Sequence, residues 1–261
     1  MIIAADIGGS KILAGIFKES KLKRKIKLEY NKQQPLKDIL TKALDSLYDS
    51  NIKAIKVACP GPGDFSKGIL YSPENINARN FNIKEFLKKT YKTKIIVNND
   101  ANCFALYQSH KLKISNLVGI TLGTGIGFGA IINNKVYLGR GLASELSHII
   151  LGNQELEKEY KNILKNSKYS SFKEAYESKK SDKRIIFDKL SEIVAITIYD
   201  TILAYDPEAI VLGGGVTKAK TLFWEQAKDR LSELLKRYGI KKPVLKIDSS
   251  ELATLKGASL L

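Results

Sequence analysis

The sequence is poor in cysteine. Its two cysteines, Cys59 and Cys103, lie in apolar or mixed surroundings. Two such residues provide neither the disulfide framework of a small secreted protein nor a cysteine cluster for a metal ion. We therefore expect two buried free thiols, and a stability that comes from a hydrophobic core, for which 261 residues are long enough.

Long hydrophobic runs are also missing. No apolar stretch approaches the ~20 residues that a membrane-spanning helix requires. The first residues lead directly into what we predict to be a core strand, and no signal or transit peptide is recognisable. These absences predict a cytoplasmic protein without a membrane partner.

Acidic residues are few relative to basic ones: 27 Asp and Glu against 43 Lys and Arg give a net charge of +16. Such an excess is compatible with nucleic-acid binding, or with lysine-rich solvated surfaces that attract anionic phosphates. The densest basic cluster, residues 18–27, alternates with apolar residues as an exposed strand does. Because the sequence has neither a helix-turn-helix pattern nor an aromatic-rich basic motif, we expect no nucleic-acid partner.

The beginning of the chain combines features of an anion-binding turn. An apolar run reaches Asp6, passes through Gly8, Gly9, Ser10 and Lys11, and continues as a second apolar run. This pattern predicts a β-hairpin with a tight glycine turn. Glycines let backbone N–H groups approach a bound anion, and Asp6 with Ser10 can hold a metal ion or water beside it. An ordinary hairpin that contains two glycines is the alternative at this point.

The same arrangement occurs a second time. Residues 117–132 consist of an apolar run, the glycine-rich segment Gly123–Gly129 and another apolar run, which indicates an internal structural duplication. A third glycine segment, Gly213–Gly215, follows a short apolar run. The chain is therefore predicted to be an α/β protein of two lobes. The predicted lobes are residues 1–114 with 249–261, and residues 115–248, joined by a hinge near residues 112–117.

Apolar periodicity predicts the remaining elements. Asn82 is the expected N-cap of one helix, and Pro35 precedes another. Helices are predicted at about 36–48, 83–91, 101–111, 155–166, 171–178, 182–205, 218–237 and 251–261, and further strands at about 24–30, 54–58, 68–71, 94–97, 209–212 and 243–247.

Glycine turns at strand ends are commonly found around phosphates. One such loop is weak evidence. A duplicated pair with adjacent hydroxyls (Ser10, Thr121 and Thr124), together with a third loop, favours a nucleotide held between the lobes. The Gly-Lys-Ser/Thr ending of the P-loop is absent from the sequence, which argues against that class of NTPase.

Asp100 is the best candidate for a catalytic base, because it stands where a predicted strand meets a predicted helix. A carboxylate within hydrogen-bond reach of a hydroxyl can accept its proton while the oxygen attacks phosphorus. N-capping of the helix is the alternative role. The neighbouring amides of Asn98, Asn99 and Asn102 suit a polyhydroxylated ligand and favour the catalytic role.

Glu145 and His148 lie three residues apart in a predicted loop, 139–148. A single histidine is more often structural, but with a carboxylate nearby it can also recognise hydroxyls. Trp224 and the scattered tyrosines are interpreted as packing residues, and His110 is assigned no special role.

Several of these motifs, in their order along the chain, resemble the ROK family (repressors, open reading frames and sugar kinases) of the actin-like/hexokinase ATPase superfamily. The resemblance covers essentially the full length. DIGGSK (6–11) and TLGTGIGFG (121–129) resemble the two phosphate motifs of the family, and VLGGGV (211–216) its adenosine-side glycine motif. CPGPGD (59–64), NNDAN (98–102) and GLASELSH (141–148) resemble its Pro-Gly segment, its catalytic-Asp segment and its sugar-contacting segment.

The resemblance implies a two-lobed actin-like (ribonuclease H-like) ATPase fold, with duplicated mixed β-sheet domains flanked by helices and a terminal helix that returns to the N-terminal lobe. It implies a kinase that uses ATP and Mg²⁺ and phosphorylates a hydroxyl, for most members the 6-hydroxyl, of a hexose such as glucose or of an amino or N-acetyl hexose. It also implies a homodimer.

The resemblance further assigns roles to residues of this sequence. Asp100 is the expected base, and Asp6 is expected to hold Mg²⁺ through water. The expected sugar-binding residues are Asn75, Asn99, Asp100, Glu145, His148 and Glu157. The expected ATP-binding residues are Asp6, Gly8, Gly9, Ser10, Lys11, Thr121, Gly123, Thr124, Gly125, Gly213 and Gly214.

The sequence departs from the family pattern after the histidine. Many members carry a Cys-x-Cys-Gly-x-x-Gly-Cys zinc segment there, whereas residues 149–160 are short and contain no cysteine, so we predict no structural zinc. Glu157 is the nearest match to the sugar-contacting glutamate that ends this segment. Ser144 and Ser147 stand where glycines are usual, and Phe128 replaces a frequent glycine; these changes bear on the sugar preference.

Two alternatives to a sugar kinase are considered. The family also contains non-catalytic sugar-sensing regulators, which carry a helix-turn-helix before the first glycine hairpin. Here the hairpin begins at Met1 and the NNDAN segment is intact, so we expect an enzyme. A kinase of the same superfamily with a non-sugar acceptor is disfavoured by the sugar-type segment GLASELSH.

Overall fold

The computed structural model describes residues 1–73, 76–165 and 167–261. These residues form two compact units. Unit 1 consists of Met1–Leu112, Leu138–Ala143 and Leu252–Leu261, and unit 2 of Lys113–Tyr137 and Ser144–Glu251. The lobes predicted from the sequence differ from these units chiefly at Leu138–Ala143, a segment that belongs to unit 1.

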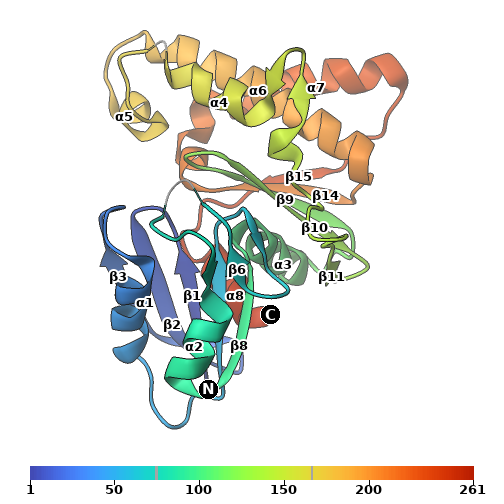
Figure 1. Cartoon of the computed structure of the whole chain (residues 1–261). Coiled ribbons are helices and arrows are strands. Elements are labelled where there is room, and N and C mark those ends of the chain that lie inside the picture. The colour runs from blue at the N-terminus through green and yellow to red at the C-terminus, as the bar shows by residue number, and fades with distance from the viewer. Residues whose placement is uncertain (74–75, 166) are drawn as a thin grey trace. The chain divides into compact units, whose positions relative to one another are not determined.

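Unit 1 is built on a five-stranded mixed sheet (Figure 1). Its first three strands form an antiparallel meander, and the other two run parallel to the first strand. In the order β3-β2-β1-β4-β8, the strands are Lys21–Glu29, Lys11–Lys18, Ile2–Ile7, Ala54–Cys59 and Lys94–Asn99. The glycine hairpin and the edge strand expected from the sequence are thus confirmed.

Alternating side chains of this sheet are buried on its two faces. Ile3, Ala5 and Ile7 of β1 pack with helices α1 (Leu36–Asp45) and α2 (Ile83–Tyr91) in one core. Ala4 packs on the other face, in the core of helices α3 (Asp100–Leu112) and α8 (Ala253–Leu260). Asp6 has the same parity as Ala4, so its side chain lies on the α3–α8 face.

A small three-stranded sheet lies beside α2 in unit 1. It consists of β5 (Gly63–Asp64), β6 (Ile69–Leu70) and β7 (Phe81–Asn82). The expected capping role of Asn82 is confirmed, because its side-chain oxygen accepts a hydrogen bond from the Glu85 amide at 2.9 Å. Helix α1 ends at Asp45, three residues before its predicted end.

Unit 2 repeats the sheet of unit 1. In the order β11-β10-β9-β14-β15, its strands are Lys135–Val136, Ile126–Ile132, Leu117–Leu122, Ala209–Gly213 and Val244–Ile247. An antiparallel meander is again followed by two parallel strands. The structural duplication predicted from the glycine hairpins is therefore confirmed.

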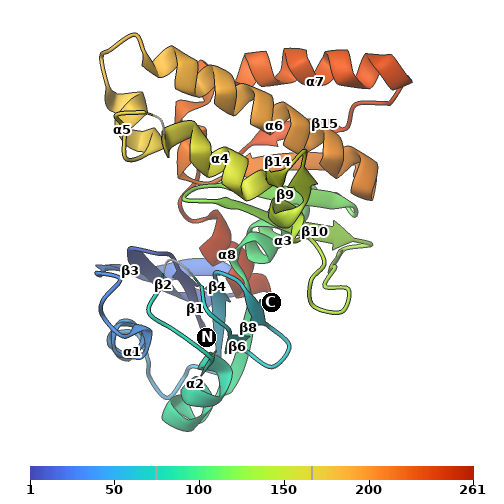
Figure 2. The same ribbon diagram turned by 45° about the horizontal axis from the view of Figure 1, so that its top comes forward.

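Helices cover one face of the unit 2 sheet and share its core with alternate residues of β9, β10 and β14 (Figure 2). They are α4 (Leu156–Lys165), α5 (Phe172–Glu177), α6 (Lys183–Tyr205) and α7 (Trp224–Tyr238). Two 3₁₀ helices, η1 (Leu146–His148) and η2 (Gly215–Leu222), and the hairpin of β12 (Ile150–Leu151) and β13 (Gln154–Glu155) complete the unit.

The helix predicted at about 218–237 is wrong in its first part. The chain forms η2 up to Leu222, with a kink at Ala219, and α7 begins only at Trp224. Phe223 interrupts the helix with φ −139°, and its side chain is 1% exposed in the core of unit 2. None of the helices in the described part of the chain combines the length and apolar character needed to cross a membrane.

Candidate active site

The first glycine turn connects β1 to β2 in unit 1. The Gly8 amide donates to the Lys11 carbonyl at 2.9 Å, which closes the turn. Tyr30, the residue after β3, engages two other carbonyls of the turn: its hydroxyl donates to Gly8 at 2.5 Å, and its amide donates to Ser10 at 3.0 Å. With these carbonyls engaged, the backbone groups that the turn can offer to an anion are amides.

Asp6 and Asp100 lie at one edge of the unit 1 sheet. Strands β1, β4 and β8 are parallel, so their carboxyl ends meet at this edge, and Asp6, Ala58 and Asn98 are neighbours across the ladder. Burial and, to a smaller extent, the Asp100 carboxylate raise the pKa of Asp6 to about 7, although Lys11 opposes the shift. The two carboxylates therefore interact electrostatically.

The alternative role of Asp100, as the N-cap of α3, is taken by its neighbour. The Asn99 side-chain oxygen accepts hydrogen bonds from the amides of Ala101 at 2.9 Å and Asn102 at 3.3 Å. This is the bonding pattern of an N-cap, whereas Asp100 is the first residue of the helix and its Oδ1 accepts from the next amide, that of Ala101, at 2.8 Å.

The two cysteines lie beneath this edge as buried free thiols, as expected from the sequence. Burial is the main cause that raises the pKa of both thiols, and the carboxylates of Asp100 and Asp6 add to the shift. The Cys59 thiol contacts the Asn98 carbonyl at 3.7 Å. Both cysteines are therefore protonated packing residues rather than nucleophiles.

Asp6, with Asp100 nearby, fits Mg²⁺, which prefers oxygen ligands and keeps several waters when it binds nucleotide phosphates. Asp6 is partly buried, and its pKa is raised in part by Asp100, so a divalent cation would relieve the repulsion between the two. Among the residues that the structure describes, no three or more His, Cys, Asp or Glu side chains form a metal-binding group. A cation held by Asp6 would accordingly take its remaining ligands from phosphate and water.

The second and third glycine segments lie side by side in unit 2. Gly213 pairs with Thr121 in the β14–β9 ladder, and the Gly123 amide donates to the Gly125 carbonyl at 2.9 Å. Gly214 has φ +88°, and a Cβ there would collide with the backbone of Leu122. Only glycine fits this position, because both the conformation and the space exclude a side chain.

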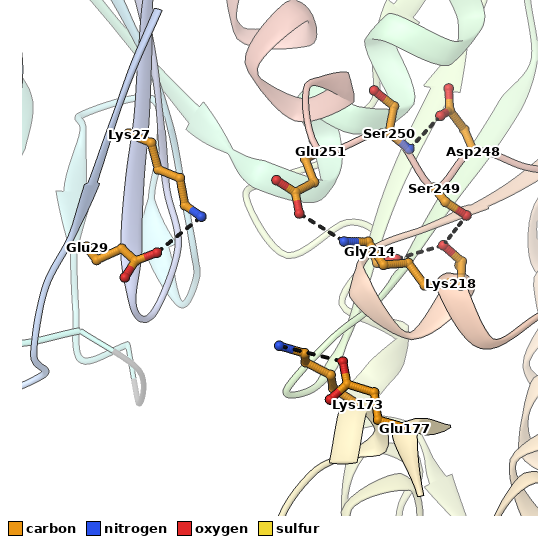
Figure 3. A network of polar contacts seen from close by, with 11 residues as sticks. Lys27, Glu29, Lys173, Glu177, Gly214, Lys218, Asp248, Ser249, Ser250 and Glu251 are labelled. Atoms are coloured by element: carbon orange, nitrogen blue, oxygen red, sulfur yellow. Dashed lines mark hydrogen bonds and ion pairs between the residues drawn. The ribbon is translucent and has the colours of Figure 1, made fainter. Parts of the chain in front are cut away.

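A polar network fixes the third segment (Figure 3). The Thr217 hydroxyl donates to the Gly214 carbonyl at 2.7 Å and lies 2.9 Å from the Ser249 hydroxyl. Lys218 forms an ion pair with Glu251 at 2.9 Å. The segment that follows β15 is thereby attached to η2.

Helix α4 holds the second glycine turn from two sides. The Tyr160 hydroxyl donates to the Gly123 carbonyl at 2.9 Å, and the Glu157 carboxylate accepts from the Ile126 amide at 3.3 Å. Glu157 lies so close to Gly125 that a Cβ there would be 2.5 Å from its Oε1. Lys161, one turn further along α4, pairs with Glu157 at 3.0 Å.

The other candidate hydroxyl-binding residues of unit 2 surround η1. Glu145 precedes η1 and His148 ends it. Burial raises the pKa of Glu145, His148 opposes the shift and Glu157 adds to it. Glu145 therefore interacts electrostatically with both residues. His148 Nδ1 lies 3.2 Å from a carboxylate oxygen of Glu155, a residue that no sequence motif indicated.

The predicted site residues are thus distributed over both units. Asp6, the Gly8–Lys11 turn, Asn99 and Asp100 lie at one sheet edge of unit 1. Unit 2 contains the second and third glycine segments together with Thr121, Thr124, Glu145, His148 and Glu157. Asn75, the remaining predicted sugar-binding residue, lies outside the described residues.

The sequence profile of the ROK family matches residues 2–156 and 150–261. The chain belongs to the ROK family. An N-acetyl-D-glucosamine kinase from Aliivibrio fischeri is 28% identical over 305 residues, which cover 100% of this chain and 99% of the relative.

Solved structures of ROK proteins have the same fold. A ROK hexokinase from Thermus thermophilus matches with a TM-score of 0.81 and 26% identity, over 99% of this chain and 96% of that chain. A ROK family glucokinase from Streptomyces griseus, solved in complex with glucose and AMPPNP, matches with a TM-score of 0.75 and 23% identity, over 98% and 97% of the chains. The fold is the mixed α/β actin-like ATPase fold predicted from the sequence.

Three residues of this ROK chain that contact the glycine turns or the candidate histidine were not singled out by the sequence. The sequence predicts packing roles for Tyr30 and Tyr160, and both are buried, but each also donates a hydrogen bond to a glycine turn. Glu155 precedes α4 and carries no motif. All three contacts join residues at least seven positions apart, so local patterns contain no signal for them.

Proposed function

We propose that this ROK protein is an ATP-dependent sugar kinase, which transfers the γ-phosphoryl group of ATP to a hydroxyl of a hexose or of an amino or N-acetyl hexose. The observation that carries the proposal is the placement of Asp100. It begins α3 at the sheet edge that also holds Asp6 and the first glycine turn, while Asn99 supplies the N-cap. A carboxylate at this position can accept a proton from a hydroxyl within hydrogen-bond reach.

In the proposed reaction, Asp100 accepts the proton of the sugar hydroxyl while that oxygen forms a bond to the γ-phosphorus. The bond between the γ-phosphorus and its bridging oxygen breaks, and ADP leaves with the electron pair. Asp6 would hold Mg²⁺ through water, and the ion would neutralise the phosphate charge. Lys11 follows the first glycine turn and adds positive charge there.

Phosphate binding is assigned to the glycine turns of both units. In the first turn the Gly8 amide closes the turn on Lys11, and the amides of Gly9 and Ser10 with the Ser10 hydroxyl are assigned to phosphate. Thr121, Gly123, Thr124 and Gly125 have the same role in the repeated hairpin, where the Gly123 amide closes the turn on Gly125. Gly213 and Gly214 are assigned to the adenosine. The choice of ATP is supported by the family match and by the related Streptomyces griseus glucokinase, which was solved with AMPPNP.

Sugar binding is assigned to Asn99, Glu145, His148 and Glu157, together with Asn75 and Asp100. Carboxylates, amides and a histidine are suited to hydroxyls because they accept and donate hydrogen bonds in fixed directions. The related enzymes are named as hexokinase, glucokinase and N-acetylglucosamine kinase, and these names support a hexose or an N-acetyl hexose as the substrate class. The assay described below identifies the individual sugar. We further propose the 6-hydroxyl as the acceptor, a homodimer as the assembly and a cytoplasmic location.

A coupled assay of ADP release tests the proposal directly. The protein is supplied with Mg-ATP and, in turn, glucose, mannose, fructose, glucosamine, N-acetylglucosamine and N-acetylmannosamine. Sugar-dependent ADP release is the expected result, and the ranking of kcat/KM identifies the substrate. Binding of ATP without stimulation by any sugar would overturn the sugar-kinase proposal in favour of another acceptor or a sensor.

The Asp100→Asn variant tests the role of the base. It keeps the shape of the side chain and loses the proton acceptor, so kcat should fall by about 10²- to 10⁴-fold. Sugar binding, measured by calorimetry, should change little. Asp49→Asn, an exchange at an exposed turn of the same unit, is the matched control and should retain full turnover. Asp100→Asn with near wild-type kcat would exclude Asp100 as the base.

A further inference from the structure

The two glycine turns share a contact that their motifs do not contain. In unit 1 the Tyr30 hydroxyl donates to the carbonyl of Gly8, and in unit 2 the Tyr160 hydroxyl donates to the carbonyl of Gly123. Gly8 and Gly123 are equivalent, because each is the first residue after the first strand of its sheet. The amide of each glycine also closes its turn, on Lys11 in one unit and on Gly125 in the other.

The two tyrosines reach these positions from unrelated elements. Tyr30 directly follows the edge strand β3, whereas Tyr160 lies in the middle of α4. They are 8% and 1% exposed, and burial raises the pKa of both phenols, to about 12 for Tyr30. Both hydroxyls are therefore protonated donors at any physiological pH. The duplication of the sheets does not account for the contact, since β3 and α4 are not equivalent elements.

The contact has a simple electrostatic consequence. A peptide carbonyl that faces a phosphate repels it, whereas peptide N–H groups attract it. A tyrosine that engages the carbonyl of the first glycine holds that peptide in one orientation and so keeps the oxygen directed at the phenol. In unit 1 the Tyr30 amide does the same for the Ser10 carbonyl.

We propose that Tyr30 and Tyr160 are positioning residues that orient the two glycine turns for binding the phosphates of the nucleotide. The inference rests on the proposed kinase function. It extends the proposed site by two residues outside the glycine motifs, which act through the turn peptides without touching substrate. Glu157 supports the second turn in the same way through the Ile126 amide, and so links a candidate sugar-binding side chain to the phosphate turn.

Tyr30→Phe, Tyr160→Phe and the double variant test the proposal, because each removes a hydroxyl and preserves the buried ring. The matched control is Tyr48→Phe. Tyr48, which follows the end of α1, also donates to a distant backbone carbonyl, that of Tyr91 at 2.6 Å. This carbonyl lies at the end of α2 rather than at a glycine turn. Thermal unfolding of all four variants, KM for Mg-ATP, KM for the sugar and the Kd of Mg-AMPPNP are measured.

Each single variant at a turn should weaken Mg-AMPPNP binding and raise KM for Mg-ATP roughly 3- to 10-fold, the change expected for one hydrogen bond. KM for the sugar should remain within about twofold. Tyr48→Phe should lose a similar amount of thermal stability and keep wild-type nucleotide affinity. Nucleotide affinities in Tyr30→Phe and Tyr160→Phe that match the Tyr48→Phe control would overturn the proposal.

Direct nucleotide binding separates this inference from the proposed function. If the wild type binds Mg-AMPPNP but phosphorylates no sugar, the sugar-kinase proposal fails, and the AMPPNP affinities of the variants still decide the role of the tyrosines. If the wild type phosphorylates a sugar and both variants bind AMPPNP as tightly as it does, the kinase proposal stands and the positioning role is excluded.

Discussion

Ser144 and Phe128 explain how this chain departs from the ROK pattern without losing the fold. Ser144 stands where glycines are usual and retains the glycine-like conformation, with φ +71°. Its hydroxyl, buried with the rest of the residue, accepts a hydrogen bond from the Tyr205 hydroxyl at 3.3 Å, which offsets the strained backbone. Phe128 replaces a frequent glycine and packs into the helix-covered core of unit 2.

Asp200, on α6, is a partly buried carboxylate that lowers the stability of the folded protein. Its Oδ2 is buried and makes no hydrogen bond to any residue that the structure describes. Burial raises the pKa of this carboxyl above its ordinary value of 3.8. A folded-state pKa above the unfolded one means that the folded protein binds the proton more tightly, so this group lowers stability as the pH rises through that range.

The Asp200→Asn variant should consequently be more stable than the wild type above the raised pKa, by about 1 kcal/mol at pH 8. The gain should disappear near pH 3, where the wild-type carboxyl is protonated in both states. Urea unfolding at the two pH values measures the difference. Glu192→Gln, on an exposed position of the same helix, is the control and should show no gain at pH 8. A gain of equal size at both pH values would contradict the electrostatic explanation.

At the scale of elements, the closest packing near the candidate base is between α3 and α8. Gly257 of α8 faces the backbone of Cys103, and a Cβ there would overlap the Cys103 carbonyl. Because α3 begins at Asp100, the position of α8 also determines the position of the candidate base. Glycine is required here by the close approach of two helices rather than by its backbone conformation.

Gly257→Ala should therefore destabilise the protein by ~1–3 kcal/mol, since the added methyl group forces the two helices apart. It should also lower kcat, because the start of α3 moves with the helix. Urea unfolding and the ADP-release assay measure both effects. Thr254→Ala, on the same helix and only partly buried, should leave both unchanged. Wild-type stability of Gly257→Ala would show that α8 relaxes without cost.

The elements that could be predicted from the sequence are those determined by their own residues. The two glycine hairpins, the Asn82 cap and the long helix α6 follow from local spacing and turn chemistry. The two-residue strands β5, β7, β12 and β13 escaped prediction, because their hydrogen bonds come from partners rather than from a pattern. The break at Phe223 could not be predicted for a similar reason. The side chain is buried in the core of unit 2, and this tertiary packing overrides the local helical pattern.

At the scale of the whole molecule, the repetition of one sheet in two units could be predicted from the repeated strand–turn–strand pattern, and the fold class followed. The residues that support the glycine turns could not be predicted. Tyr30 reaches Gly8 only because β3 pairs with β2 in a particular register, and Tyr160 reaches Gly123 only because α4 packs on the turn. Such contacts depend on the assembled tertiary structure.

The net charge of +16 is a further property of the whole chain, and part of it lies beside the candidate phosphate site of unit 1. On the edge strand β3, Lys27 pairs with Leu13, which pairs with Asp6, so Lys27 lies two strands away from Asp6 in the same row. Lys25 precedes it on the same face, and Lys27 forms an exposed ion pair with Glu29 at 3.2 Å. Lysines also protect an edge strand from pairing with other chains.

Two strand spacings are about 10 Å, which is close to the Debye length at 0.1 M salt. Lys25 and Lys27 should therefore attract the phosphates of ATP at low ionic strength and be screened at high ionic strength. Raising the salt from about 0.05 M to about 0.5 M should increase KM for Mg-ATP several-fold and leave KM for a neutral sugar unchanged. In the double variant Lys25→Gln/Lys27→Gln the salt dependence should be smaller.

Lys37→Gln/Lys42→Gln is the matched control, since these lysines are exposed on α1, which covers the opposite face of the sheet. It removes the same charge from the chain and should keep the wild-type salt dependence. If the two double variants reduce the salt dependence equally, the effect comes from net charge alone and β3 has no special role. If neither reduces it, the basic surface of unit 1 does not attract the nucleotide, and protection of the sheet edge remains as the role of the β3 lysines.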